Sequence, residues 1–539
     1  STHCISSAAS DVYKRQTMDS VIRKFPIGIQ NFESLINDGY VYVDKTALVY
    51  RMATTGRYYF LSRPRRFGKS LLLSTIEAYL SGKKELFKGL AIEKLEQKWE
   101  EHPILHLDLN TENYKEPDSL RRRLDSTLSY WEQLYGTRAV EISLPLRFEG
   151  IVRRACEKTG HRVVILVDEY DKPMLQAIGN ETLQAEYRNL LKAFYSVLKS
   201  QDRYIKLAFL TGVTKFGKVS VFSDLNNLND ISMDYRYMDI CGITDKELHE
   251  NFDGDVALLG ERNGLTKEEC YVKLKEQYDG YHFDYDTVGL YNPFSIFNTL
   301  SKLKFSDYWF ETGTPSFLVY LLKHSNYRLD RITEEQVSGD LLNSIDSMSC
   351  NPIPVIYQSG YLTIKGYDKE FGIYRLGFPN KEVENGFIKY LLPFYTPVTE
   401  QESSFIITSF VMDIRQGNVD SFMQRLQSMF ADTDYKIVGK MELYFQNAMY
   451  LVFKMMGFYT DVERTTSNGR IDVVLQTKDY IYVMELKLDG SADEALRQIE
   501  EKGYALPFAK DSRKLYKIGV NFSSEIRGIV EWKIVEDNS

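Results

Sequence analysis

The chain contains 539 residues with a formal net charge of −8, and 43% of them are hydrophobic and 26% charged. This length predicts two to four domains, each large enough to bury its own core. The acidic balance disfavours a protein whose whole surface is built for nucleic acid, because phosphate binding relies on clusters of Lys and Arg. Local basic patches that bind nucleic acid are still compatible with this composition.

No part of the sequence approaches the roughly twenty consecutive apolar residues that a membrane span requires, and the N-terminus lacks an apolar signal core. The five cysteines are scattered and never spaced as Cys-x-x-Cys, which argues against a disulfide framework and a zinc site. We therefore expect a soluble, cytoplasmic protein without a membrane partner. Residues 1–17 show no periodicity and Met18 is a plausible start, so residues 1–17 are interpreted as a non-native or disordered leader.

Short apolar runs alternate with amphipathic helical patterns from Phe25 to about Thr244. Runs typical of strands occupy residues 58–61, 104–109, 163–167 and 205–211. Helical patterns occupy residues 70–80, 118–134, 148–158 and 183–199. This alternation predicts an α/β domain with a parallel sheet covered by helices on both faces.

The first motif with chemistry is Leu61-Ser-Arg-Pro-Arg-Arg-Phe-Gly-Lys-Ser70, between a strand-like and a helix-like run. It would present backbone N–H groups, a helix N-terminus and Lys69 to nucleotide phosphates, with Ser70 holding Mg²⁺. Gly-Lys-Ser alone is also compatible with an ordinary helix start, and Arg63 stands where a Walker A loop has its first glycine. The expected nucleotide-binding residues of this motif are Arg65, Arg66, Phe67, Gly68, Lys69, Ser70 and Leu71.

The second motif is the apolar run Val163–Val167, which suits a strand buried on both faces and ends in Asp168 and Glu169. Parallel sheets bind their ligands beyond the carboxyl ends of the strands. We expect Asp168 to contribute to the Mg²⁺ shell and Glu169 to activate water. Together with the motif around Lys69, this pair of carboxylates favours a P-loop nucleotide site over a chance helix start.

An extra strand, Ile104–Leu109, lies between the two phosphate motifs in the sequence. An extra strand is typical of the additional-strand class of P-loop ATPases, in which a polar residue at the end of the following strand senses the γ-phosphate. Thr211 is the candidate for that position, and the alternative is a strand-ending threonine without a special role.

Basic residues are explained mostly without a second phosphate site. The arginines within residues 63–66 are assigned to nucleotide phosphates, whereas Arg121–Arg123 is typical of a solvated helix face. Arg203 and Arg236 are the candidate arginine fingers, although each is more simply a surface residue.

Residues 245–400 predict a helical lid followed by a small helical or winged-helix region. Its aromatic residues, such as those of Gln277–Phe283, are interpreted as core and turn packing. The composition shift near Thr396–Ser404 is the best boundary. The predicted domains are therefore a P-loop ATPase domain at residues 18–244, the lid region at 245–400 and a further α/β domain at 401–539.

Two short strand-like runs near the C-terminus carry carboxylates and a lysine. Asp472 lies in Gly469–Leu475, and Glu485 and Lys487 project from one face of Ile481–Leu488. A hairpin would bring the three side chains together. Two carboxylates beside an ammonium suit metal-assisted phosphodiester hydrolysis, in which the carboxylates hold Mg²⁺ or Mn²⁺ and the lysine steers the attacking water.

Two flanking helical patterns add candidates. Ser491–Tyr504 carries Gln498 on a face that can reach the site, and Tyr435–Met456 carries Glu442 as a further metal-side carboxylate. A solvent-facing charge pair is the simpler explanation of Glu-x-Lys taken alone. Asp472 and the order helix, strand, strand, helix favour the metal site instead.

Several motifs together resemble a known family. They are Phe25-Pro-Ile-Gly-Ile-Gln-Asn-Phe32, Tyr42-Val-Asp-Lys-Thr46, Arg63-Pro-Arg-Arg-Phe-Gly-Lys-Ser-Leu71, Val167-Asp-Glu-Tyr-Asp-Lys-Pro173 and Leu210-Thr-Gly-Val-Thr214. From Met18 onward the chain resembles the AAA-ATPase-like family of gut bacteria and other microbes, whose members typically end in a PD-(D/E)XK nuclease-like domain. The C-terminal Ile471-Asp472 with Glu485-Leu-Lys487 resembles the core of that domain.

The resemblance carries expectations for individual residues. The absent first P-loop glycine is a habit of the family, whereas Arg470-Ile471 stands where the nuclease superfamily often has a proline before its first aspartate. The resemblance implies a phosphate role for Lys69, metal roles for Ser70, Asp168, Asp472 and Glu485, water activation by Glu169, and the nuclease lysine at Lys487.

The leading hypothesis is an ATP-binding and ATP-hydrolysing switch, dependent on Mg²⁺, that is coupled to a metal-dependent nuclease acting on DNA or RNA. Nucleic acid is the expected partner, and homo-oligomerisation is an open option. The alternative is a catalytically decayed regulator or adaptor that binds nucleotide together with nucleic acid or protein. Acyl transfer has little support, because the sequence lacks a Gly-x-Ser-x-Gly elbow and a Cys/His constellation.

Overall fold

The computed structural model describes residues 23–215, 221–222, 225, 227–310, 316–343, 351–396, 398–431, 441–457, 461–467 and 470–537. The leader expected at residues 1–17 lies outside them. The chain divides into two compact units. Unit 1 comprises Ser1–Trp309, Asn343–Ser347 and Gln358–Gly360, and unit 2 comprises Phe310–Leu342, Met348–Tyr357 and Tyr361–Ser539.

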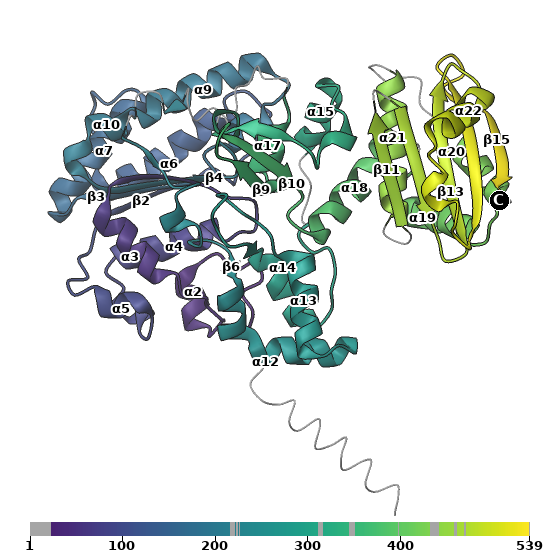
Figure 1. Ribbon diagram of the computed structural model, residues 1–539. Coiled ribbons are helices and arrows are strands. Elements are labelled where there is room, and N and C mark those ends of the chain that lie inside the picture. The colour runs from purple at the N-terminus through teal and green to yellow at the C-terminus, as the bar shows by residue number, and fades with distance from the viewer. Residues whose placement is uncertain are drawn as a thin grey trace, which may run out of the picture. The chain divides into compact units, whose positions relative to one another are not determined.

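A five-stranded parallel sheet forms the centre of unit 1 (Figure 1). Its strands, in spatial order, are β2 (Ile104–Asp108), β3 (Val163–Asp168), β4 (Ile205–Gly212), β1 (Tyr58–Ser62) and β5 (Asn229–Asp230). β1 and β3 are buried along their whole length, as strands covered on both faces must be. The parallel sheet predicted from the alternating pattern is confirmed.

One detail of the expected sheet differs. The strand that separates β1 from β3 in space is β4, whereas Ile104–Leu109, the extra strand of the sequence, forms β2 at the sheet edge. Position along the chain could not reveal this, because strand order depends on how the crossover helices pack. The inserted strand is therefore β4, which carries Thr211 next to its last residue.

Helices cover both faces of this sheet (Figure 1). One face is covered by α6 (Ser119–Tyr135), α7 (Leu144–Thr159), α9 (Glu181–Tyr195) and α10 (Val197–Ser200), and the other by α3 (Thr46–Thr55) and α4 (Lys69–Leu80). The helical pattern at residues 183–199 is two helices, divided at Ser196. α7 begins before its apolar pattern does, because Ser143 caps it and Pro145 occupies its first turn.

Unit 1 also contains the short helices α2 (Phe32–Asn37), α5 (Ala91–Leu95) and α8 (Lys172–Gln176). Where the helical lid region was expected, it has α12 (Asp245–Asn263), α13 (Lys267–Tyr278) and α14 (Pro293–Lys302). α12 and α13 each begin with a capping box, in which a threonine and a glutamate satisfy each other's backbone N–H groups. Phe25 and Ile27 pack against the core of these helices. The N-terminal segment and the lid therefore share one core.

The first part of unit 2 contains a small antiparallel sheet with strand order β8 (Gln336–Ser338), β10 (Ile373–Gly377) and β9 (Thr363–Asp368). The helices of this part are α15 (Ser316–His324), α16 (Gly339–Asn343), α17 (Ile353–Gln358) and α18 (Lys381–Tyr395). Helices with a β-hairpin are the elements of the winged-helix region that the sequence predicts.

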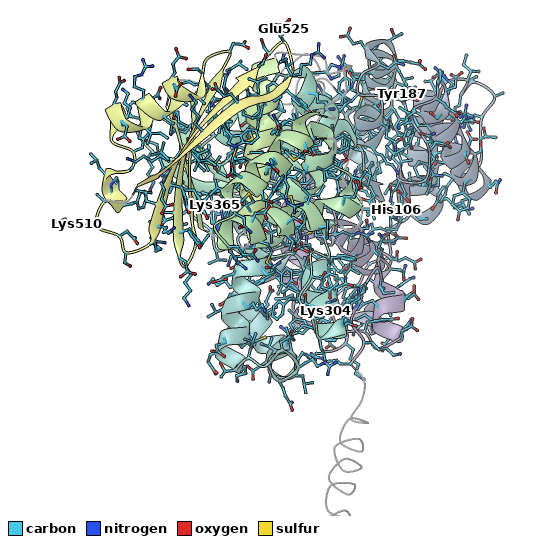
Figure 2. All side chains as sticks on the ribbon, turned by 90° about the vertical axis from the view of Figure 1, so that its right-hand side faces the viewer. His106, Tyr187, Lys304, Lys365, Lys510 and Glu525 are labelled. Atoms are coloured by element: carbon cyan, nitrogen blue, oxygen red, sulfur yellow. The ribbon has the colours of Figure 1, made fainter. Side chains whose placement is uncertain are left out.

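The C-terminal part of unit 2 is built on a mixed sheet with strand order β11 (Asp461–Ser467), β12 (Arg470–Gln476), β13 (Tyr480–Leu488), β14 (Lys514–Ser523) and β15 (Gly528–Asp537). β13 and β14 are parallel, and the other pairs are antiparallel. Lys510 precedes β14 and Glu525 follows it, and they lie at opposite ends of the sheet (Figure 2). The helices of this part are α19 (Glu400–Arg415), α20 (Val419–Ala431), α21 (Met441–Met456) and α22 (Ala492–Lys502).

Both faces of β13 are buried. On one face Ile481 and Val483 pack against Ile499 of α22. On the other face the ring of Tyr482 stacks on that of Tyr516 with centroids 5.5 Å apart, and its hydroxyl donates to the Ile414 carbonyl of α19 at 2.5 Å. Since side chains alternate along a strand, Glu485 and Lys487 share the face of Ile481 and project towards α22. Among the described helices none is both long and apolar enough to cross a membrane.

Candidate functional site

The loop between β1 and α4 places Lys69 at the first position of the helix. Gly68 precedes it with φ +95°, a left-handed conformation that glycine adopts without steric cost. Lys69 is buried, and its Nζ donates to the carbonyls of Arg63 at 3.0 Å and Pro64 at 3.3 Å. The same Nζ lies 3.5 Å from Glu169 Oε1. The two predicted phosphate motifs therefore meet at this lysine.

The carboxylate of Asp168 accepts hydrogen bonds from the hydroxyl groups of two other predicted site residues. Ser70 Oγ donates to Asp168 Oδ2 at 2.6 Å, and Thr211 Oγ1 donates to Asp168 Oδ1 at 2.7 Å. Thr211 is fully buried at the end of β4, so its hydroxyl is fixed in position. Hydroxyl and carboxylate oxygens at a helix N-terminus are the donors that Mg²⁺ prefers together with phosphate, so this donor set fits the expected cation.

The backbone at Glu169 is strained. Its φ is +55°, in the left-handed region that non-glycine residues seldom adopt. The next residue, Tyr170, donates its N–H to the carbonyl of Thr211 at 3.0 Å, which fixes the turn against the end of β4. Such strain persists only where neighbouring contacts hold it. The result is a carboxylate directed towards Lys69.

Asp171 is a site residue that the sequence reasoning missed. It is fully buried, and its carboxylate accepts hydrogen bonds from Val213 N at 3.2 Å, Thr214 N at 2.6 Å and Thr214 Oγ1 at 2.7 Å. Burial, followed by the charge of Glu169, raises the pKa of Asp171 to about 6. It binds the loop after β3 to the loop after β4. The available signal was its place two residues after Glu169 in an unusually acidic turn.

Gly212 has a packing reason to be glycine. A Cβ atom there would lie 2.6 Å from Asp171 Oδ1 and 2.7 Å from the Tyr170 ring. Contacts this short occur only if the neighbours move. The close approach of the two loops thus depends on the missing side chain.

Arg63 differs from its expected phosphate role. Its side chain is 1% exposed and donates to the carbonyls of Ser232 at 2.7 Å and Met238 at 3.3 Å. Its guanidinium also lies 3.9 Å from the Phe283 ring centroid. Arg63 therefore supports the loop from within the protein, which explains how the turn forms without the first glycine of a Walker A motif.

Aromatic residues after α12 brace the P-loop, although the sequence pattern suggested only general core packing. The bracing contacts join Phe67 to Tyr281 with ring centroids 4.9 Å apart, Phe67 to Phe283 at 5.5 Å, Arg66 to Phe294 at 4.8 Å, and Trp309 Nε1 to the Arg65 carbonyl at 3.0 Å. The side chains of Arg65 and Arg66 are exposed on the loop, while Leu71 continues α4. The candidate fingers are occupied locally: Arg236 pairs with Asp234, and Arg203 lies over the Tyr204 ring.

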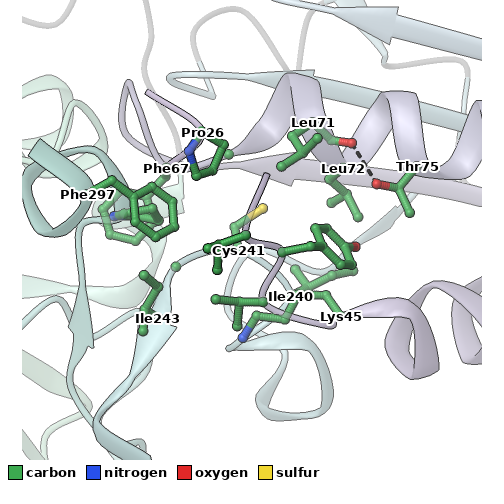
Figure 3. Close-up of a pocket in the computed structure, with 16 residues that line it drawn as sticks. Pro26, Lys45, Phe67, Leu71, Leu72, Thr75, Ile240, Cys241, Ile243 and Phe297 are labelled. Carbon is green, nitrogen blue, oxygen red and sulfur yellow. Dashed lines mark hydrogen bonds between the residues drawn. The ribbon is translucent and has the colours of Figure 1, made fainter. Parts of the chain in front are cut away.

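An apolar pocket opens beside Gly68 (Figure 3). It has three walls: the N-terminal segment, the first turns of α4, and the segment around Cys241 with the start of α14. Polar atoms enter it sparingly. Thr75 Oγ1 donates to the Leu71 carbonyl at 2.8 Å, and Lys45 Nζ lies 2.5 Å from Glu247 Oε1 in the α12 capping box. The motif around Lys45 gives no sign of this pocket in the sequence alone.

The second predicted cluster forms on β12, β13 and α22. Asp472 and Glu485 are directly opposite each other in the register of the antiparallel pair β12 and β13. Glu485 is fully buried, and Lys487 Nζ lies 3.0 Å from Glu485 Oε1 and donates to Gln498 Oε1. The structure thus joins Glu485, Lys487 and Gln498, as the helix and strand periodicities predicted. The side chain of Asp472 lies outside the described part of the chain.

Gly519 brings α22 onto this cluster. It is the β14 neighbour of Glu485, and a Cβ there would lie 2.2 Å from the Ala492 carbonyl and 2.9 Å from Leu496 Cγ. Because that space is left empty, α22 crosses the sheet closely enough for Gln498 to reach Lys487. Ser491 begins the helix with a capping box, as its cap chemistry predicted.

For Glu442 the structure describes the backbone and not the side chain. It belongs to the first turn of α21, and its side chain lies outside the described residues. Gln446, one turn later, is buried. Fully buried carboxylate oxygen at Glu485, with a second carboxylate in register, fits a hard divalent cation such as Mg²⁺ or Mn²⁺.

The fold and the two clusters define a class: a P-loop ATPase unit of the additional-strand type in one chain with a C-terminal nuclease-like sheet domain. A family model described as "Predicted AAA-ATPase" matches residues 26–222, and one described as "PD-(D/E)XK nuclease superfamily" matches residues 440–532. A protein of Azotobacter chroococcum mcd 1 with the name "Uncharacterized protein in vnfD 5'region" is 34% identical over 523 residues, which cover 94% of this chain and 98% of that protein. The chain belongs to this AAA-ATPase-like family, with a PD-(D/E)XK nuclease superfamily domain at its C-terminus.

Proposed function

We propose that the chain is an ATP-dependent switch: unit 1 binds and hydrolyses Mg-ATP, and the bound nucleotide controls a metal-dependent nuclease of unit 2 that acts on DNA or RNA. The convergence of Lys69, Ser70, Asp168, Glu169 and Thr211 carries the first half of the proposal. The second half is carried by Glu485 with its lysine neighbour.

In unit 1, Lys69 would exchange the two loop carbonyls for phosphate oxygens, because an ammonium gains more from a charged acceptor than from a neutral one. Ser70 and Asp168 would hold the cation, and Glu169 would orient and deprotonate the attacking water. Thr211 would register the γ-phosphate through Asp168. A bound cation supplies charge neutralisation of the phosphates.

The apolar pocket beside Gly68 would take the nucleobase. Its wall includes Leu71, Leu72 and Thr75, the helical turns that follow the phosphate-binding residues. Pockets for small ligands are mostly apolar with a few placed polar groups. Since phosphates at the N-terminus of α4 leave the base beside these turns, one nucleotide can occupy both sites.

In unit 2, Glu485 and Asp472 would hold a divalent cation, and Glu442 is proposed as a further carboxylate of that site. Lys487 would stabilise the charge that develops on the scissile phosphate, and Gln498 would hold the ammonium in place. Oxygen ligands of this kind do not discriminate between DNA and RNA. The proposed domain boundaries remain those at residues 244 and 400.

The test uses purified full-length protein with ATP, Mg²⁺ or Mn²⁺, and mixed DNA and RNA, followed by assays of phosphate release and strand length. We expect both products, and Glu169→Gln should bind ATP but release phosphate about 10²- to 10⁴-fold more slowly, the usual effect of a lost general base. If the wild type yields neither free phosphate nor shortened strands, that result contradicts an enzymatic function. It then supports the alternative, a nucleotide-dependent adaptor.

A further inference from the structure

Lys215 connects the end of the unit 1 sheet to two distant segments of the chain. Its backbone N–H donates to Gln358 Oε1 at 2.6 Å, and its Nζ donates to Asn343 Oδ1 at 2.5 Å. The Nζ also lies 2.8 Å from Asp230 Oδ2, and the Lys215 side chain is 4% exposed. A buried ammonium is stable only with such oxygen partners, so these contacts fix its position.

Asn343 and Gln358 stand where the chain passes between the units. Unit 1 includes Asn343–Ser347 and Gln358–Gly360, while the chain before and after each of these segments belongs to unit 2. Gln358 is the last residue of α17, whose other residues belong to unit 2. Lys215 therefore contacts unit 1 residues that are covalently continuous with unit 2.

Two boundary residues of unit 1, Gly360 and Trp309, lie against the P-loop. A Cβ at Gly360, which has φ +90°, would lie 2.6 Å from Cβ and Cγ of Pro64. Trp309, the last unit 1 residue before the chain first enters unit 2, donates to the carbonyl of Arg65. Two of the described boundary residues, Trp309 and Gly360, thus lie next to the P-loop.

A short path also connects Lys215 to the candidate catalytic carboxylate. Thr214 donates both its N–H and its hydroxyl to Asp171, which lies two residues after Glu169. Asp171, Thr214 and Lys215 are all buried, so this path is shielded from solvent. A displacement of the Glu169 turn by bound nucleotide must therefore move Thr214 or break these bonds.

We propose that Lys215 is a transmission residue: its hydrogen bonds to Asn343 and Gln358 carry the nucleotide state of unit 1 into the segments that continue as unit 2. This inference rests on the proposed nucleotide binding at Lys69. A ligand shifts a conformational equilibrium only through contacts that differ between the two states. In this proposal the hydrogen bonds of Lys215 are the contacts that differ between the nucleotide-bound and nucleotide-free states.

The test measures two quantities on the full-length protein: the affinity for a fluorescent ATP analogue, and the hydrogen exchange of residues 353–368 with and without ATP. The variants are Lys215→Met, Gln358→Met and Asn343→Ala, with Lys206→Met, in the preceding strand β4, as the control. Asn343 is exposed, so its variant removes the hydrogen bond to Lys215 without opening the core.

We expect ATP to slow exchange of residues 353–368 in the wild type and in Lys206→Met. Lys215→Met and Asn343→Ala should bind the analogue as the wild type does, while the ATP effect on exchange falls about fivefold or more, a usual size for coupling between sites. An undiminished ATP effect in both variants overturns the transmission role and leaves the proposed function standing. Failure of the wild type to bind the analogue overturns the proposed function and this inference with it. If Lys215→Met unfolds, Asn343→Ala decides.

Discussion

Ser70 Oγ lies 2.6 Å from Asp168 Oδ2, although 98 positions separate the two residues in the chain. The contact brings the helix that follows β1 to the end of β3, with β4 between the two strands. Each of the two motifs alone is a weak indication of a nucleotide site. Because this contact brings them together in space, they form one site.

Lys69→Ala should weaken nucleotide binding at least about tenfold, because a hydrogen bond to a charged group contributes about 1.5–3 kcal/mol. Titration with a fluorescent ATP analogue measures the change. Lys88→Ala, an exposed lysine beyond the same helix, is the matched control and should bind as the wild type does. Equal affinities for the two variants would remove Lys69 from the site.

Lys487→Ala should abolish divalent-dependent cleavage of nucleic acid and leave nucleotide binding intact. Removal of the lysine leaves Glu485 buried without its cation, which costs about 3–5 kcal/mol of stability, so Glu485→Gln serves as a second, nearly isosteric variant. Strand length on denaturing gels is the readout, and Lys510→Ala, an exposed lysine of the same domain, is the control. Cleavage at the wild-type rate by both Lys487→Ala and Glu485→Gln would exclude this site.

Asp171 predicts a specific dependence of stability on pH. Its pKa is raised to about 6 from 3.8 by burial and then by Glu169. Between these two values the folded protein binds the proton and the unfolded chain does not, so the contribution of Asp171 to stability falls as pH rises and is constant above about 6. The melting temperature of the wild type minus that of Asp171→Asn should therefore decrease from about pH 4 to about pH 6. A difference that increases over this range contradicts the assignment.

Gly212→Ala should destabilise unit 1 by about 1–3 kcal/mol, the usual cost of overpacking, because the new methyl group meets Asp171 and Tyr170. Gly254 offers a matched comparison: it lies in α12 with open space around it, and alanine there should stabilise the helix by about 0.5–1 kcal/mol. Thermal melting compares the two. Similar Tm values for both variants would show that the two loops can separate without cost.

Periodicity sufficed for much of the fold, and particular elements show where it stopped. β1 and β3 were recognisable because strands buried on both faces are continuous apolar runs. The position of β4 between them is a property of helix packing across the sheet, which no local pattern records. Ser196 likewise divides α9 from α10 inside a pattern that looked continuous.

In the candidate sites too, local periodicity predicted some residues, whereas tertiary packing determined others. Glu485, Lys487 and Gln498 were predictable because strand and helix periods fix which side chains share a face. Arg63 and Asp171 were not, since their partners are backbone groups of segments distant in the sequence. The pocket beside Gly68 was also invisible, because its walls come from three separate stretches of the chain.

The central claim is that one nucleotide controls one nuclease, and the most direct measurement is the rate of Mg²⁺- or Mn²⁺-dependent cleavage with and without ATP in the wild type and in Lys69→Ala. We predict that ATP changes the rate in the wild type and not in Lys69→Ala, while both proteins keep the cleavage that depends on Lys487. Two results would contradict control of the nuclease by nucleotide bound at Lys69. One is a cleavage rate that responds to ATP in Lys69→Ala as it does in the wild type, and the other is a wild-type rate that does not change with ATP.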